Sequence, residues 1–296
     1  NNIVSNIKLV YGLQKNALGL KKIKHWQLHS FPNNPGLFLI RNPFTPLGQR
    51  YWIRKCLDDY PRKPNKLNID NEIESKDWWA ECFENGKCNS QLLKKLRWTT
   101  LGYHHNWDTK IYTEDNRNDF PEDLAELSDV IAKYLGYDNF RAEAAIVNYY
   151  HMNSTLSAHT DHSEVNLEAP LFSFSFGQSA IFLLGGNEKS TTPLPLLLQS
   201  GDIVIMSKEA RLCYHAVPKI LPSKTSPWND ERHLTPSIKN TNLGFKYLID
   251  PIKIINEINE NAEDIHWRKF QNYVSEARIN MNVRQVLNET QTCLTD

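Results

Sequence analysis

Two histidines and one aspartate are spaced so that they could bind a metal ion. His159 and Asp161 are two residues apart, and His215 follows Asp161 by 54 positions. In an extended strand, side chains i and i+2 point the same way, so His159 and Asp161 could reach one ion together. A third ligand from a later strand, His215, would leave positions open for a cosubstrate and dioxygen, which suits Fe(II). Taken alone, an HxD pair is more often a chance pair in a loop, and a single histidine such as His215 is more often a core or surface residue. Only their combination indicates an iron site.

Polar and apolar residues alternate near the C-terminus in a second pattern that could do chemistry. Arg278, Asn280, Asn282 and Arg284 would share one face of a strand. Burying two arginines on that face would be costly without anionic partners. A dicarboxylate such as 2-oxoglutarate fits, because arginine binds a carboxylate through two parallel hydrogen bonds. The alternative is an exposed polar face on an edge strand, with the intervening apolar residues pointing inward.

Short strands are the elements that would position these residues, and they begin near residue 142. Runs of β-forming residues separated by glycine and proline are typical of a double-sheet jelly roll or barrel. Asn148 and Tyr150 share a face of the first run and could add hydrogen-bond donors for the same cosubstrate. We expect strands at 145–151, 172–176, 180–184, 194–198 and 201–206.

The chain before these strands has a more helical pattern. Pro46 opens one partly apolar run, and the leucines of residues 120–135 recur at helical spacing. Residues 222–242, which are rich in Pro, Ser, Thr and Asn, should form a loop. We expect a strand at 36–40, a helix at 46–59, helical pieces over 70–96 interrupted at 85–86, a β-rich segment at 97–103 and an amphipathic helix at 120–135.

Composition indicates a folded protein without a strong overall charge. Hydrophobic residues make up 40% of the 296 residues, and 34 basic residues balance 34 acidic ones. A nucleic-acid-binding protein with this balance needs local basic patches, for which 21–24 and 94–97 are candidates, although both could be solvated helix faces. Five cysteines without a CxxC pair argue against a disulfide scaffold or zinc ribbon and favour a reducing intracellular compartment. No apolar run reaches the roughly 18–20 residues of a membrane span.

Taken together, these motifs resemble those of the AlkB nucleic-acid dioxygenases, in the family's order. The similarity extends from about residue 36 to residue 287 and is greatest to the branch of the first mammalian AlkB homologue. Longer stretches at 96–104, 106–108, 140–144 and 173–186 carry the resemblance to that branch. The short motifs are Asn148-x-Tyr150, His159-x-Asp161, His215 and Arg278-x-Asn280-x-Asn282-x-Arg284.

The resemblance implies an α+β fold with a double-stranded β-helix (jelly-roll) core, N-terminal helices and a nucleotide-recognition lid. Residues 1–135 would form the helical segment and lid, and residues 136–296 the catalytic core, in one compact unit. Iron would be ligated by His159, Asp161 and His215. The distal carboxylate of 2-oxoglutarate would be held by Tyr150 and Arg278, with Asn148, Asn280 and Arg284 near its keto-acid end. Substrate contacts would come from Trp79, Tyr103, His104 and His105.

The implied activity is oxidative demethylation of alkylated bases with Fe(II), 2-oxoglutarate and O2. Targets in this branch are N6-methyladenine in DNA, and N1-methyladenosine or 5-methylcytidine in tRNA. The target base would be unpaired or flipped, because it is hidden in a stacked duplex. Tyr103 and Trp107 could stack on it, although Trp98 and Trp107 could equally be core residues. We expect a monomer in the nucleus, the mitochondrion or both, without membrane association.

Two other functions fit the same residues. A protein demethylase acting on histone methyl-lysine would use the same iron site. A non-catalytic nucleic-acid-binding module would retain the metal ligands without turnover, but the complete triad and both arginines argue against it. Asn282 stands where the family usually has threonine. Because the iron ligands and the cosubstrate arginines are intact, activity should survive this difference.

Overall fold

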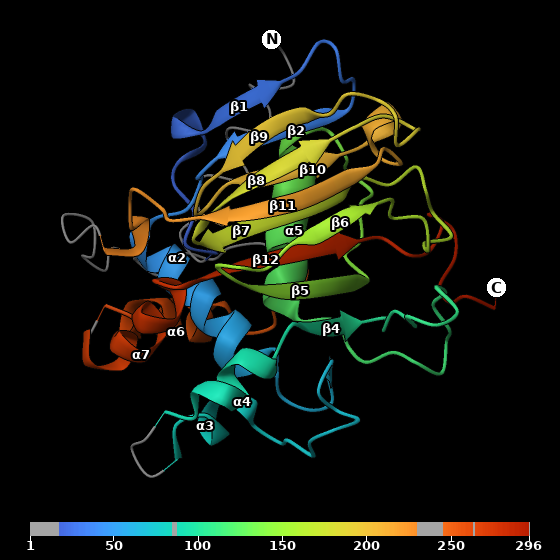
Figure 1. Cartoon of the computed structure of the whole chain (residues 1–296). Helices are drawn as coiled ribbons and strands as arrows, with labels where there is room; N and C mark the ends of the chain where they lie inside the picture. Colours follow the sequence, from blue (N-terminus) through green and yellow to red (C-terminus); the bar gives the residue numbers. More distant parts are fainter. Residues whose placement is uncertain (1–17, 85–87, 230–244, 263, 296) are drawn as a thin grey trace.

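Two antiparallel sheets build the protein, which is described here from a computed structural model for residues 18–84, 88–229, 245–262 and 264–295 (Figure 1). The large sheet contains, in spatial order, β1 (Gln27–Ser30), β2 (Leu37–Arg41), β10 (Ile203–Met206), β7 (Leu171–Gly177), β12 (Ala277–Arg284), β5 (Ala144–His151), β4 (Trp98–Gly102) and β3 (Lys66–Leu67). The small sheet contains β6 (Leu156–His159), β11 (His215–Leu221), β8 (Ser179–Leu184) and β9 (Leu194–Leu198).

Apolar side chains on alternate positions give the large sheet two buried faces. In β10, Ile203 and Ile205 belong to the core on the helix side, whereas Val204 and Met206 belong to the cluster between the sheets. That second cluster also contains Phe182 and neighbouring side chains of the small sheet, so the two sheets pack face to face. The expected jelly-roll core is therefore confirmed.

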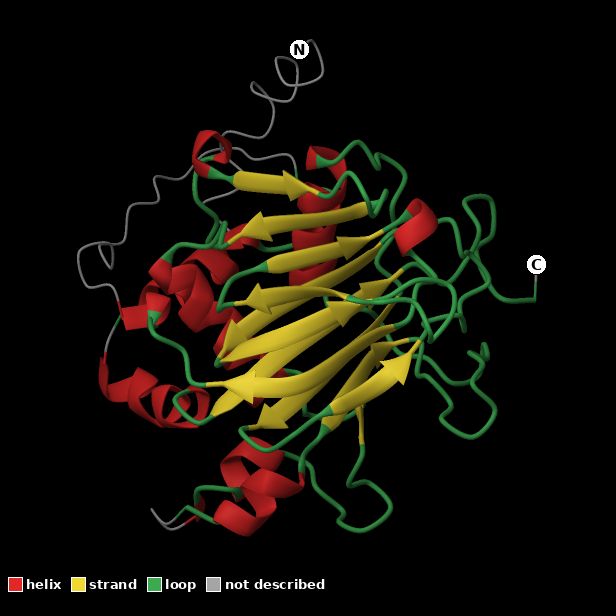
Figure 2. Ribbon diagram, turned by 45° about the horizontal axis from the view of Figure 1, so that its top comes forward, coloured by secondary structure: helices red, strands yellow, loops and turns green. Residues whose placement is uncertain are grey.

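Helices gather along one side of the sheets and behind the large one (Figure 2). In α5 (Glu122–Tyr134), Leu124, Leu127 and Ile131 are fully buried against the outer face of the large sheet. The hydroxyl of Thr45 caps α2 (Pro46–Arg54) by accepting a hydrogen bond from the Gly48 amide. The expected helix over 46–59 is present, but its last five residues form the π-helical η3 (Lys55–Asp59).

Several shorter helices complete the described chain. α3 (Trp78–Glu81) and α4 (Ser90–Lys95) are the helical pieces expected over 70–96. α6 (Pro251–Glu260) and α7 (Asp264–Val274) pack beside α2, and neither helix was predicted from the sequence. Residues 230–242 of the expected loop lie outside the described residues. The 3-10 turns are η2 (Ile23–His25), η5 (Lys208–Ala210) and η6 (Pro227–Asn229).

Strands from the first part of the chain complete the large sheet. β1 to β4 all precede residue 136, and β4 pairs directly with β5 of the second part. The division at residue 135 therefore does not separate two sheets, and the lid assigned to the first part remains a prediction. β4 coincides with the β-rich segment expected at 97–103.

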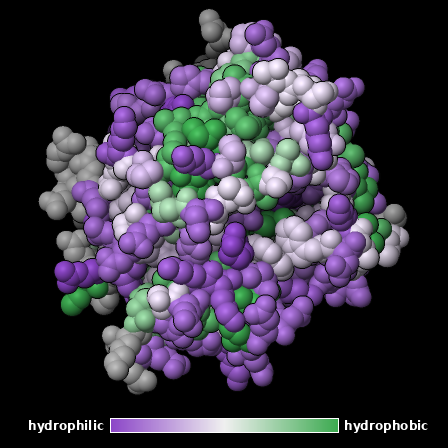
Figure 3. Space-filling view, viewed as in Figure 1, coloured by the Kyte–Doolittle hydropathy of each residue, from purple (hydrophilic) through white to green (hydrophobic). Residues whose placement is uncertain are grey.

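The surface is mostly hydrophilic in the view of Figure 3, with an apolar area over β8 and β9. Leu197 of β9 contributes to exposed apolar surface at 46% exposure. Within the described residues, no helix combines the length and hydropathy that a membrane crossing would need.

Candidate active site

His159, Asp161 and His215 come together at one end of the small sheet. His159 ends β6 and lies directly opposite His215, the first residue of β11. Asp161 follows two residues after the end of β6, so it lies in a loop and not in the extended strand expected from the spacing. Its carboxylate oxygens lie 3.9 Å from Nε2 of His159 and 3.8 Å from Nε2 of His215. All three candidate ligand atoms lie within 4.8 Å of one another.

Main-chain carbonyls orient both imidazoles toward a metal. Nδ1 of His159 lies 2.9 Å from the Ser157 carbonyl, and Nδ1 of His215 lies 3.2 Å from the Cys213 carbonyl. Since a carbonyl only accepts, each Nδ1 carries the proton and each Nε2 lone pair is free for a metal. Burial lowers the pKa of His215 to about 4, despite the opposing effect of Asp161. The His215 imidazole is therefore neutral and available as a metal ligand.

Asp161 is held in its ionised form. Burial alone would raise its pKa, but Arg284, His215 and His159 together hold the pKa well below its usual range. Nη2 of Arg284 donates to Oδ2 of Asp161 at 2.8 Å. Two imidazole nitrogens and one carboxylate form a donor set that fits Fe(II) and leaves coordination positions open.

Arg278 is a buried cation without a counterion among the described residues. Its side chain is 1% exposed and donates only to the Ser175 hydroxyl at 2.9 Å and the Ile279 carbonyl at 3.4 Å. Its Nε has no hydrogen-bond partner, and burial lowers the pKa of the guanidinium to about 10. The Tyr150 ring lies 5.6 Å from the guanidinium carbon. The exposed polar face considered as an alternative is therefore wrong. Arg278, Ser175 and Tyr150 are called the cradle below, and an anionic ligand fits it.

Strand register places the remaining polar residues on the same inner face. Tyr150 is opposite Arg278, and Asn148 is opposite Asn280. Asn280 is 5% exposed and donates to the Ser173 hydroxyl at 2.8 Å and the Phe174 carbonyl at 3.0 Å. Asn282 is half-buried on this face. Because Ile279, Met281 and Val283 pack into the helix-side core, these polar residues face the small sheet, which carries the two histidines.

Comparison with known proteins identifies the family. A family model described as the 2OG-Fe(II) oxygenase superfamily matches residues 36–284. The chain belongs to this superfamily. The human nucleic acid dioxygenase ALKBH1 is 40% identical over 279 residues, which cover 91% of this chain and 69% of the human protein. This similarity confirms the resemblance to AlkB oxygenases of the first mammalian branch.

Two further proteins are similar to this 2OG-Fe(II) oxygenase. The DNA N(6)-methyladenine demethylase ALKBH1A of Arabidopsis thaliana is 29% identical over 309 residues, covering 93% of this chain and 82% of the plant protein. The solved structure of OsALKBH1 matches with a TM-score of 0.51 and 18% identity, covering 88% of this chain and 100% of that chain. The structural likeness supports the fold. Family membership implies Fe(II), 2-oxoglutarate and O2 as cofactors.

The oxygenase holds Trp79 in its core. Trp79 is 1% exposed, stacks on Phe270 at 4.9 Å and meets the edge of Phe83 at 4.8 Å. A contact between this ring and a substrate base would require α3 to separate from α7.

Tyr103 and His104, expected as substrate contacts, are buried within the loop that follows β4. The Tyr103 hydroxyl donates to Glu114 at 2.8 Å, and burial followed by this contact raises its pKa to about 12. His104 lies 2.7 Å from both the Thr100 hydroxyl and the Asn118 amide. These side chains hold the loop in shape in the described structure.

His105 is influenced electrostatically by Arg284, Glu164 and the candidate ligand Asp161. It is half-buried, and its ring packs against Trp107 at 4.7 Å and Tyr112 at 5.6 Å. Burial lowers its pKa, and Arg284 lowers it further. The Tyr112 hydroxyl in turn donates to Glu164 at 3.3 Å, so this aromatic group reaches the surroundings of the oxygenase's candidate iron site.

Trp98 is a site residue that sequence reasoning did not select. It is directly opposite Asn148, so its ring shares the inner face with the candidate cosubstrate residues. Trp107, which is 46% exposed, lies 5.0 Å from it. Alternation within 97–103 placed Trp98 on one face, but only the pairing with β5 identifies which face. The oxygenase therefore has a continuous aromatic row, formed by Trp98, Trp107, His105 and Tyr112, along one side of the site.

Proposed function

We propose that this oxygenase removes methyl groups from methylated bases in nucleic acid. The aromatic row beside the candidate iron site is the observation that carries this proposal, because it supplies ring faces on which bases stack. The human relative is named a nucleic acid dioxygenase and the Arabidopsis relative a DNA N(6)-methyladenine demethylase, which supports the same substrate class. The target would be N6-methyladenine in DNA, or N1-methyladenosine or 5-methylcytidine in tRNA.

Three side chains would hold the metal and five the cosubstrate. His159 and His215 would bind Fe(II) through Nε2, and Asp161 through its carboxylate. When bound, iron and 2-oxoglutarate would supply the oxidation by O2 of the methyl carbon. On the two methyladenines the resulting hydroxymethyl group on nitrogen leaves as formaldehyde, whereas on 5-methylcytidine the oxidised carbon stays bonded to C5. Arg278 would neutralise the distal carboxylate of 2-oxoglutarate beside the Tyr150 hydroxyl. The other end of the cosubstrate would lie near Asn148, Asn280 and Arg284.

The chain's own groups orient the reactants and exclude water, as in other cofactor-dependent sites. The buried inner face surrounds the cosubstrate with polar groups already fixed by strand pairing, so they need little reorganisation. Trp107 is exposed enough to meet an unpaired base, whereas a paired base would first have to leave its stack. Unpaired or bulged sites should therefore be demethylated faster than regular duplex.

Nucleoside mass spectrometry tests the proposal. The protein is incubated with Fe(II), 2-oxoglutarate and ascorbate, beside single-stranded, bulged and duplex methylated DNA and native tRNA. His159→Ala is the control for non-enzymatic loss. Loss of a methylated base only with wild-type protein, accompanied by succinate, supports the proposal and names the base.

Two other outcomes contradict the proposed substrate or the proposed catalysis. Succinate without base loss, together with demethylation of histone methyl-lysine peptides, would indicate a protein demethylase. Nucleic-acid binding without succinate in metal-loaded protein would indicate a binding module.

A further inference from the structure

We propose that Arg211 is a positioning residue that fixes the iron-ligand geometry by clamping the loop that carries Asp161. This loop, residues 160–170 between β6 and β7, is called the ligand loop below. The inference rests on the proposed iron site, and it concerns a residue outside the ligand and cosubstrate sets.

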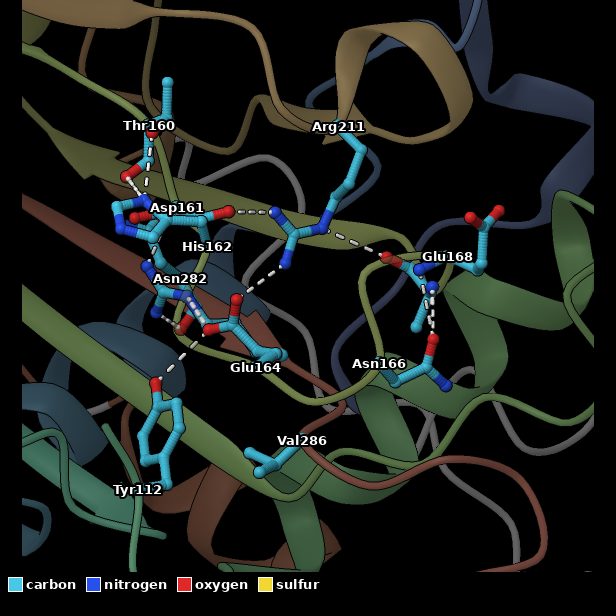
Figure 4. A network of polar contacts seen from close by, with 12 residues as sticks. Tyr112, Thr160, Asp161, His162, Glu164, Asn166, Glu168, Arg211, Asn282 and Val286 are labelled. Atoms are coloured by element: carbon cyan, nitrogen blue, oxygen red, sulfur yellow. Dashed lines mark hydrogen bonds and ion pairs between the residues drawn. The ribbon is translucent and has the colours of Figure 1, made fainter. Parts of the chain in front are cut away.

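Arg211 donates three hydrogen bonds to the ligand loop. Its Nη1 donates to the Asp161 carbonyl at 2.7 Å, its Nη2 to the Glu164 carboxylate at 2.8 Å and its Nε to the Ala169 carbonyl at 3.1 Å (Figure 4). The side chain is 2% exposed, and the ion pair with Glu164 is buried on both sides. Three contacts from one rigid guanidinium hold three points of the loop at fixed separations.

Arg211, Glu164, Arg284 and the candidate ligand Asp161 form a closed ring of contacts. Glu164 accepts from Arg211 through Oε2 and lies 3.2 Å from Nε of Arg284 through Oε1. Arg284 in turn holds the Asp161 carboxylate, while Arg211 holds the Asp161 main chain. Asp161 is thus restrained at both ends by different guanidiniums, which limits where its carboxylate can point.

The position of Arg211 in the chain links the two halves of the metal site. It follows η5 and precedes His215 by four residues. Cys213 lies between them, and its main-chain carbonyl accepts a hydrogen bond from Nδ1 of His215. The clamp therefore ties the segment leading into His215 to the loop carrying Asp161. Asp161 and His215 lie far apart in sequence, so a contact between their flanking segments sets their separation.

Arg211 also restrains Glu164, a second carboxylate close to the proposed metal site. Both of its oxygens are engaged by guanidiniums, so this carboxylate, three residues from Asp161, is restrained from acting as a competing ligand. A shorter cation at position 211 cannot reach all three acceptors at once. It would loosen the loop and release one oxygen of Glu164.

Cobalt binding provides a readout that does not depend on turnover. Co(II) is titrated into metal-free protein and followed by its visible absorption, for wild type, Arg211→Lys and Arg50→Lys. Arg50 is the matched control, because it is also 2% exposed and donates to the Trp228 and Asn261 carbonyls away from the metal ligands. Thermal unfolding of each metal-free protein is measured in parallel.

We expect Arg211→Lys to bind Co(II) roughly 10- to 100-fold more weakly, as for other residues that orient metal ligands. Its cobalt absorption spectrum should change as well. Arg50→Lys should lose thermal stability but keep the wild-type affinity and spectrum. Equal cobalt affinity and identical spectra in all three proteins would overturn the proposal and leave Arg211 a purely structural residue.

Glu164→Gln keeps the test decisive if Arg211→Lys does not fold. This variant retains the Arg211 contacts to Asp161 and Ala169 but loses the charge that joins the two arginines. Weaker cobalt binding supports the ring, and wild-type binding overturns it. His159→Ala reports on the iron site itself: if wild type binds Co(II) no better than this variant, the proposed function fails, and the clamp with it.

Discussion

Trp98 and Asn148 lie directly opposite each other in the pairing of β4 with β5, and the same row continues to Asn280 and Ser175. A tryptophan from the first part of the chain therefore shares one sheet face with candidate cosubstrate residues from the second. The half-buried Trp98 ring contacts the exposed ring of Trp107. An aromatic surface thus leads from solvent into the proposed site.

Trp107→Ala should weaken binding of single-stranded methylated DNA, because it removes the exposed end of this surface. Loss of one base–aromatic stack costs about 1–3 kcal/mol, or roughly 5- to 150-fold in affinity. Fluorescence anisotropy with a labelled oligonucleotide measures the change. Trp79→Ala is the control: it should lower the free energy of unfolding by about 3–5 kcal/mol while the folded fraction binds normally. Equal DNA affinity of wild type and Trp107→Ala would remove this ring from the substrate surface.

Arg278→Met should not destabilise the protein in the absence of cosubstrate. A buried charge without a counterion costs free energy to desolvate, and Arg278 has no counterion in the described chain, so an apolar side chain of similar volume removes that cost. At 100 times its Kd, 2-oxoglutarate should stabilise wild type by about 2.7 kcal/mol and leave the variant unchanged. Urea unfolding with and without 2-oxoglutarate checks both statements.

Arg50→Met is the comparison for Arg278→Met. Arg50 donates to the main-chain carbonyls of Trp228, Asn261 and Ala262, so its loss leaves buried acceptors unpaired and should cost about 1–3 kcal/mol or more. If Arg278→Met were destabilised as strongly as Arg50→Met, the cradle would be a structural site and not a ligand site.

Asp161→Asn should abolish tight metal binding while the fold persists. The amide keeps the size of the carboxylate but removes its negative charge, and Arg284 retains Glu164 as an ion-pair partner. We expect at least about a 100-fold loss of Co(II) affinity, the upper range for changes around metal ligands. Cobalt titration and circular dichroism measure the two properties, and retained affinity would exclude Asp161 as a ligand.

His104 should make stability depend on pH. Burial, and then the charge of Lys66, lower its pKa to about 4. A histidine with a lowered pKa stabilises the folded state above its unfolded pKa of about 6.5, and that stability is lost as the pH falls toward 4. Between pH 7 and 5, wild type should lose up to about 2 kcal/mol more than His104→Gln, which cannot titrate. Urea unfolding at both values tests this, and parallel losses in the two proteins would contradict it.

Many of the strands and helices could be predicted from residues that are close together in the sequence. β7 alternates apolar residues with serine, and Pro46 opens α2 after a capping threonine, so these elements follow from side chains close in sequence. Nothing local separates the end of α2 from a π-helical turn, because that choice depends on what packs against Lys55–Asp59. α6 and α7 were missed because short amphipathic segments rich in polar residues acquire much of their stability from packing.

Residue types and spacing along the chain specify the kinds of chemistry available: two histidines and an aspartate for a metal, and alternating arginines for an anion. Residue type and spacing are enough for that, because ligand softness and charge belong to the side chains. The folded arrangement was needed to show that the face bearing Arg278 is buried, that Trp98 borders the site while Trp79 lies in the core, and that Arg211 contacts the ligand loop. These facts depend on which strands pair and in what register, and such long-range pairing cannot be read from neighbouring residues.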